Sequence, residues 1–167
     1  MKLKKIVICS CLVALFCVLR MFTTIVITNM WQVQPANIIL SISGAIFGPW
    51  IGALVGVLAD LIGYWTRVDT GFYFFGFTIS AAMIGLIYGC VFRFVKIKSM
   101  FLKVVIAQSL VCVIVDLCLN TYWLGVMYGN GVFVLAPYRL FTKLAELPCF
   151  AAVTYVLLKV YEKTVRS

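Results

Sequence analysis

Residues 36–65, "ANIILSISGAIFGPWIGALVGVLADLIGYW", carry only one charged side chain, that of Asp60. A single helix of this length would be about 45 Å long, whereas the hydrocarbon core of a bilayer is about 30 Å thick. The sequence "FGPW" lies in the middle, and Pro49 disfavours helical geometry at Gly48 before it. The stretch therefore predicts two short helices, about 36–47 and 50–65, that form a re-entering pair joined at Gly48-Pro49.

The whole chain has the composition of a membrane protein. Its 167 residues are 65% hydrophobic and 11% charged, with a mean hydropathy of +1.14. A soluble domain of this size cannot cover so much apolar surface with polar side chains. The other apolar runs predict helices at about 6–28, 76–92, 104–124 and 137–158. We therefore expect an all-α protein in which residues 1–167 form a single six-helix transmembrane bundle.

Basic residues indicate how the bundle lies in the membrane. The net charge is +9, and most of the basic residues fall in three places: Lys2, Lys4 and Lys5; Arg93, Lys96, Lys98 and Lys103; Lys159, Lys163 and Arg166. Six crossings place all three groups on the cytoplasmic side, as the positive-inside rule expects, whereas five would place the middle group outside. The prediction is a cytoplasmic N- and C-terminus, outer loops at about 29–35, 66–75 and 125–136, and no nucleic-acid partner.

The sequence contains no arrangement of residues that is typical of catalysis or metal binding. It contains seven cysteines but no histidine and no CxxC pair, so we interpret the cysteines as small apolar packing residues. It also lacks GxxxxGK[ST], the phosphate-binding loop of many ATPases, and any convincing pairing of a nucleophile with a base. We expect a binding protein with no cofactor, no bound metal and no enzymatic activity.

Small residues recur every four positions, a spacing that lets helices approach closely in lipid. They are Gly44, Gly48, Gly52 and Gly56 in the second apolar run, and Ala81, Gly85 and Gly89 in the third. The first helix has a weaker version of this spacing, in Ser10, Ala14 and Val18. Packing within the bundle and contact with a partner protein are both compatible with the pattern.

Ionisable and polar residues gather in the outer half of the predicted spans. They are Arg20; Asp60 and Tyr64; Asp116, Asn120 and Trp123; and Arg139 and Lys143, with Glu146 near mid-depth. Charges inside a membrane usually pair with one another or face a cavity. Three cations and three acids are compatible with internal ion pairs, such as Lys143 with Glu146, and equally with a polar pocket open to the outside.

Aromatic residues crowd the same level, most densely in "TGFYFFGFT" at residues 70–78. Their rings can stack on a planar ligand, while Gly71 and Gly76 shape the turn. An aromatic and cationic pocket suits a flat ring that carries carboxylates.

Five stretches together resemble a known family, the S components of energy-coupling factor (ECF) vitamin transporters, and in particular the folate-specific ones. They are "VLRMF" (18–22), "SGAIFGPWIGALVGVLADLIG" (43–63), "GFYFFGFTISAAMIGLIYG" (71–89), "LNTYWLGVMYG" (119–129) and "PYRLFTK" (137–143). The sequence departs from the family at Phe75, where a proline is expected, and at Val18, where a small residue is expected.

The resemblance implies a multi-pass protein of the bacterial cell membrane that captures folate outside the cell. It also implies two kinds of partner, a membrane coupling subunit of the EcfT type and two cytoplasmic ATPases of the EcfA type. The coupling subunit would meet the first helix at Ser10, Ala14 and Val18. Thiamine, riboflavin or a queuosine precursor as ligand, a structural membrane protein and a membrane enzyme remain as alternatives.

The chemistry of folate assigns roles to the candidate residues. Arginine and lysine can hold the two carboxylates of its glutamate, and the flat pterin needs stacking rings and polar edges. The predicted ligand-binding residues are Arg20, Arg139 and Lys143 for charge; Asp60, Tyr64, Thr78, Asp116 and Asn120 for polar contacts; and Tyr73, Phe75 and Trp123 for stacking.

Overall fold

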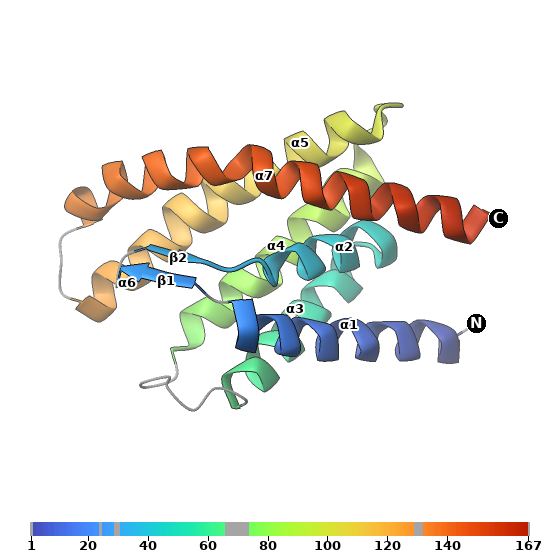
Figure 1. Ribbon diagram of the computed structural model, residues 1–167, viewed down its shortest axis with the longest axis horizontal. Coiled ribbons are helices and arrows are strands. Elements are labelled where there is room, and N and C mark those ends of the chain that lie inside the picture. Colours follow the sequence, from blue (N-terminus) through green and yellow to red (C-terminus); the bar gives the residue numbers. More distant parts are fainter. Residues whose placement is uncertain (1, 24, 29–30, 66–73, 129–131, 167) are drawn as a thin grey trace.

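The computed structural model describes residues 2–23, 25–28, 31–65, 74–128 and 132–166. The chain forms a bundle of helices that lie along a common long axis, with a small two-stranded sheet near one end (Figure 1). In chain order the elements are α1 (Lys2–Thr23), β1 (Ile25–Thr28), β2 (Trp31–Val33), α2 (Asn37–Phe47), α3 (Pro49–Trp65), α4 (Phe75–Phe94), α5 (Met100–Leu110), η1 (Val111–Leu119), α6 (Asn120–Tyr128) and α7 (Val132–Arg166).

The corner between α2 and α3 lies where the sequence predicts it. α2 ends at Phe47, and α3 begins at Pro49, a residue that is well suited to the first turn of a helix. Gly48 between them has a φ of 89°, a conformation that only glycine adopts without strain. Its amide donates a 2.9 Å hydrogen bond to the carbonyl of Gly44 and so closes the last turn of α2.

Small residues bring α2, α3 and α4 into close contact. A methyl group added at Gly52 would lie 2.6 Å from the Cα of Gly44 and 2.8 Å from the carbonyl oxygen of Gly85. One added at Gly89 would collide with the backbone of Pro49. The spacing of four therefore serves packing within the bundle, since these glycines of different helices face one another.

The first helix ends earlier than predicted, and its expected end is a β-hairpin instead. α1 stops at Thr23 rather than near residue 28, and Ile25–Thr28 pairs antiparallel with Trp31–Val33. Every residue from 23 to 28 is β-branched, a composition that favours extended backbone over helix. The fold is helical as expected, and this short hairpin is the part of the described chain in which strands replace the predicted helix.

The last two spans are longer than their apolar runs. α5, η1 and α6 follow one another without a break from Met100 to Tyr128, and the middle portion is π-helical. α7 begins five residues before Pro137, the predicted start, and continues to Arg166. The apolar pattern marks the part of a helix that lies in lipid, whereas these helices extend beyond it.

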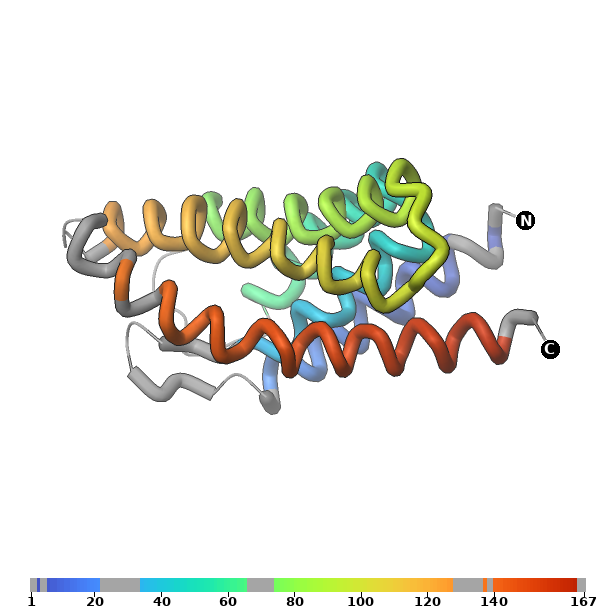
Figure 2. The backbone as a smooth tube through the Cα atoms, turned by 90° about the horizontal axis from the view of Figure 1, so that it is seen from above, coloured from blue at the N-terminus to red at the C-terminus, as the bar shows by residue number. Residues whose placement is uncertain are grey.

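Among the residues that the structure describes, six apolar helical segments correspond to the six predicted helices. Three are long enough to cross a membrane, namely Phe75–Phe94, Met100–Met127 and Leu140–Thr164; three are shorter, namely Ile6–Met21, Asn37–Phe47 and Pro49–Trp65. Both chain ends lie at the same end of the bundle, in two perpendicular views (Figures 1 and 2). The hairpin and α6 lie toward the opposite end (Figure 1).

Candidate functional site

A buried ion pair joins three helices toward the end of the bundle that carries the hairpin. Nη1 of Arg20, in the last turn of α1, lies 2.5 Å from Oδ1 of Asp60 on α3. The hydroxyl of Thr78 on α4 donates a 2.7 Å hydrogen bond to Oδ2 of the same carboxylate. Asp60 and Thr78 are 5% and 1% exposed. Both carboxylate oxygens of Asp60 therefore contact partners inside the protein.

The Arg20 side chain packs closely against its neighbours. Its guanidinium carbon is 5.7 Å from the centre of the Phe16 ring, close enough for a cation–π contact. A methyl group at Gly63 would come within 3.2 Å of Nη1. The arginine is therefore closely packed between α1 and α3. This packing holds in place the end of α1 that leads into the hairpin.

A second polar group lies at the junction of η1 and α6. Nδ2 of Asn120 donates a 3.2 Å hydrogen bond to Oδ1 of Asp116, and the Thr121 hydroxyl donates one of the same length to the Asp116 carbonyl. Asp116 lies within the π-helical turns, where the widened backbone changes the direction of the side chains that follow. Such irregular turns are frequent at functional sites.

Aromatic rings of α4 and α6 meet beside this polar group. The indole of Trp123 packs edge-to-face on Phe74, with ring centres 5.5 Å apart, and Phe74 packs in the same way on Phe77 at 5.9 Å. A methyl group at Gly76 would lie 2.5 Å from both the Trp123 indole and the Phe74 ring. Glycine at this position therefore lets the indole lie directly against α4.

Two buried polar atoms in this cluster lack a hydrogen-bond partner among the described residues. They are Oδ1 of Asn120, an acceptor, and Nε1 of Trp123, a donor. The two residues are three positions apart on one helix, so they lie on the same side of it. An unsatisfied buried polar atom costs about 1–3 kcal/mol, so a donor and an acceptor left together indicate a place for a polar ligand edge.

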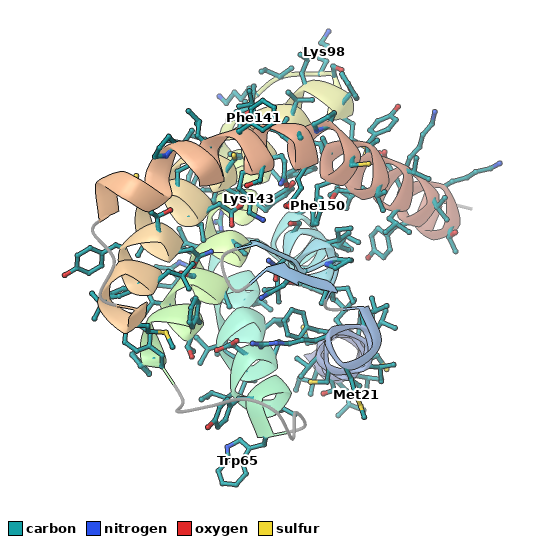
Figure 3. The ribbon with its side chains drawn as sticks, turned by 60° about the vertical axis from the view of Figure 1, so that its left-hand side comes forward. Met21, Trp65, Lys98, Phe141, Lys143 and Phe150 are labelled. Carbon is teal, nitrogen blue, oxygen red and sulfur yellow. The ribbon has the colours of Figure 1, made fainter. Side chains whose placement is uncertain are left out.

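The inner face of α7 carries a third polar group. Nζ of Lys143 is 2.6 Å from Oε2 of Glu146, and both side chains are mostly buried. Lys143 and Phe150 point into the bundle, whereas Phe141 on the opposite face points away from it (Figure 3). α7 also packs against η1, the segment that carries Asp116.

Several predicted residues lie elsewhere or outside the described part. Tyr64 is half-buried near the end of α3, and Phe75, the first residue of α4, has a side chain that is 63% exposed. Tyr73 lies outside the described residues, and of Arg139 the structure describes only the backbone, one turn before Lys143. Sequence reasoning did not select Phe74, which occupies the stacking position against Trp123.

The small residues of α1 form a separate surface. Ser10, Ala14 and Val18 are all exposed and lie on one face of the helix, while Val13 and Phe16 on the other face are buried in the core. The Ser10 hydroxyl is bonded within its own helix, to the carbonyl of Ile6 at 3.0 Å. This face of α1 is therefore left uncovered by the rest of the bundle.

The arrangement resembles known proteins along nearly its whole length. The sequence model of the family described as ECF-type riboflavin transporter, S component, matches residues 1–163. The chain belongs to this family. As an S component it is a membrane-embedded transporter subunit and not an enzyme.

Two curated relatives of this S component are folate transporters. A folate transporter FolT of Clostridium novyi is 34% identical over 124 residues, 74% of this chain and 70% of the relative. One of Leuconostoc mesenteroides is 31% identical over 161 residues, 93% of this chain and 84% of the relative.

A solved structure shares the fold of this S component. It is a crystal structure of FolT bound with folic acid, with a TM-score of 0.79 and 29% sequence identity. The match covers 93% of this chain and 91% of the other. The similarity therefore extends over nearly the whole chain and is not confined to one motif.

Proposed function

We propose that this chain is the folate-binding S component of an ECF transporter. It captures folate from outside the cell, with both termini in the cytoplasm, and delivers it inward when coupled to ATP hydrolysis by partner subunits. The three basic groups lie in the N-terminal part of α1, around the α4–α5 connection and in the C-terminal part of α7, which supports this orientation by the positive-inside rule.

The observation that carries the proposal is the pair of unsatisfied atoms beside the aromatic rings. Asn120 offers an acceptor and Trp123 a donor, and the pterin of folate has a flat edge that carries both kinds of group. Phe74 and Phe77 supply apolar surface next to them. The relatedness to a FolT that binds folic acid supports the same ligand here.

The cations of α7 distinguish folate from riboflavin, the vitamin in the family's description. Folate ends in a glutamate with two carboxylates, whereas riboflavin carries no such group. Lys143 has three N–H donors and uses one on Glu146, so it keeps donors for a ligand carboxylate. We assign Arg139 and Lys143 to the glutamate end of the ligand.

Arg20, Asp60 and Thr78 have a supporting role in this proposal. The Arg20 guanidinium and the Asp60 carboxylate already bond each other, and the Thr78 hydroxyl donates a hydrogen bond to the second carboxylate oxygen. These bonds fix the end of α1 and the start of α4, and the start of α4 lies against the Trp123 indole. Tyr64, Tyr73, Phe75 and Asp116 remain further candidate contacts with the ligand.

The exposed face of α1 is the proposed contact with the coupling subunit. Small residues at Ser10 and Ala14 permit close approach of another helix, and Val18 continues the same face. We assign this surface to a partner of the EcfT type, which in turn binds two cytoplasmic ATPases of the EcfA type.

Identification of the vitamin that co-purifies with the detergent-solubilised protein tests the proposal. Mass spectrometry of the released ligand is expected to find folate or a folate derivative. Finding riboflavin, which also colours the sample yellow, would support the second candidate that the family's description suggests and would refute the folate assignment.

A further inference from the structure

One side of α3 forms an exposed apolar stripe with a tryptophan at each end. Trp50 is 80% exposed and Trp65 is 86% exposed. Between them the exposed residues are Ile51, Leu54, Leu58 and Ile62. At about 100° per residue these side chains fall within an arc of about 120°. The opposite side of α3 carries the glycines that pack on α4.

The two tryptophans have the positions of interfacial anchors. Tryptophan is enriched where the hydrocarbon meets the headgroups, because one part of its ring is apolar and the N–H seeks a polar partner. Trp65 points away from the bundle (Figure 3), near the end where the hairpin lies. Trp50 follows the α2–α3 corner, which lies toward the same end as the α4–α5 connection with its lysines (Figure 1).

Their spacing is shorter than a bilayer. Fifteen residues of helix separate Trp50 from Trp65, which amounts to about 22 Å, against a hydrocarbon core of about 30 Å. Any tilt of α3 shortens the span further. Side chains on a helix lean toward its N-terminus, so both indole rings are displaced in the same direction along α3. The distance between the rings therefore stays close to the distance between the two backbone positions.

The other side of the bundle has ordinary or greater length. The apolar helices Phe75–Phe94, Met100–Met127 and Leu140–Thr164 have 20, 28 and 25 residues, which at 1.5 Å per residue is roughly 30 Å or more. The shortage therefore lies on the side of the three shorter apolar helices, Ile6–Met21, Asn37–Phe47 and Pro49–Trp65. We propose that the α3 stripe, residues 50–65, holds the surrounding bilayer thinner than normal, with lipid acyl chains as its occupant.

Side-chain size favours lipid over protein as that occupant. Helices that meet other helices in membranes do so through small residues, and α3 presents its glycines Gly52 and Gly56 to α4. Its exposed stripe instead carries large branched side chains between the tryptophans, such as Leu54 and Leu58. The exposed face of α1 shows the contrast, because its Ser10 and Ala14 are small.

Fluorescence quenching by brominated lipids tests this directly. Trp31→Phe/Trp123→Phe leaves the two stripe tryptophans, and further Trp→Phe changes isolate each one. The matched control is Leu58→Trp with all four native tryptophans replaced by phenylalanine. The protein is reconstituted in phosphatidylcholines with acyl chains of about 14 to 22 carbons, which span the thickness range of biological membranes.

Trp50 and Trp65 are expected to be quenched most by bromines near the headgroup in every lipid, and the tryptophan at position 58 by bromines near the chain end. Emission of Trp50 and Trp65 that shifts to the blue in the longer lipids would contradict the thinning. Weak quenching at all three positions would mean that protein covers the stripe, which also refutes the proposal. If the substituted chains do not fold, thermal unfolding of the unmodified protein in the same lipids tests the proposal. The protein is expected to be most stable in the shorter lipids. Greater stability in the longer lipids would refute the thinning.

Discussion

Arg20 and Asp60 form a buried ion pair that fastens α1 to α3, with Nη1 and Oδ1 2.5 Å apart and side chains only 13% and 7% exposed. Breaking a buried pair leaves one charge without compensation, so removal of either partner is costly. The pair lies at the end of α1 from which the hairpin starts, and Thr78 extends it to α4. The carboxylate of Asp60 thus joins three helices, α1, α3 and α4.

Asp60→Asn is expected to lower the free energy of unfolding by about 3–5 kcal/mol, because Arg20 would stay buried opposite a neutral amide. Thermal unfolding in detergent, followed by circular dichroism, measures the loss. The double variant Arg20→Met/Asp60→Leu removes both charges and should be more stable than Asp60→Asn. A single variant as stable as the wild type would show that the pair contributes nothing.

Trp123→Phe keeps an aromatic ring but removes the indole N–H, whose nitrogen has no partner among the described residues. If that N–H bonds the ligand, affinity falls by about tenfold while thermal stability stays close to wild type. Tyr122→Phe is the matched control, since the neighbouring ring is 53% exposed and also loses one polar group. Equal ligand affinity of Trp123→Phe and wild type would show that the indole N–H does not bond the ligand.

Gly76→Ala is expected to weaken ligand binding by roughly tenfold or more, because the new methyl group collides with the Trp123 indole and the Phe74 ring. Isothermal titration gives the affinity, and tryptophan emission reports whether the indole has moved. Unchanged emission together with unchanged affinity would contradict the close packing of α4 and α6.

The sequence predicts much of this fold because its strongest signals are local. A lipid span needs a long uncharged run, and Pro49 after Gly48 breaks such a run in a recognisable way. The glycine spacing likewise marks the helices that pack most closely. The hairpin was missed because its β-branched run is also apolar, so it looked like the continuation of α1.

The site is only partly readable from sequence, since its contacts join distant segments. The i, i+4 spacing brings Asp116 and Asn120 together, and the i, i+3 spacing brings Lys143 and Glu146 together. No such rule links Arg20 to Asp60, or selects Phe74 rather than Phe75 as the ring beside Trp123. Those pairings depend on how α1, α3, α4 and α6 pack.

Vesicles that contain this chain alone are expected to bind folate without accumulating it, because the sequence carries no phosphate-binding loop. Uptake of radiolabelled folate should appear only when the coupling subunit and ATPases are added, with ATP on the side of the ATPases. Vesicles without ATP are the control. ATP-driven accumulation by this polypeptide alone would contradict the assignment as a binding subunit.

The most direct test of the folate assignment compares folate, pteroate and riboflavin by calorimetric titration of the purified wild type, Lys143→Gln and Lys143→Gln/Glu146→Gln. Pteroate lacks the glutamate of folate, and the double variant corrects for the acid left unpaired when Lys143 is removed. A charge-assisted hydrogen bond contributes about 1.5–3 kcal/mol, so Lys143→Gln should weaken folate by roughly ten- to hundredfold and pteroate much less. The wild type is expected to bind folate far more tightly than riboflavin. A wild type that prefers riboflavin, or a lysine change that weakens folate and pteroate equally, would contradict the account.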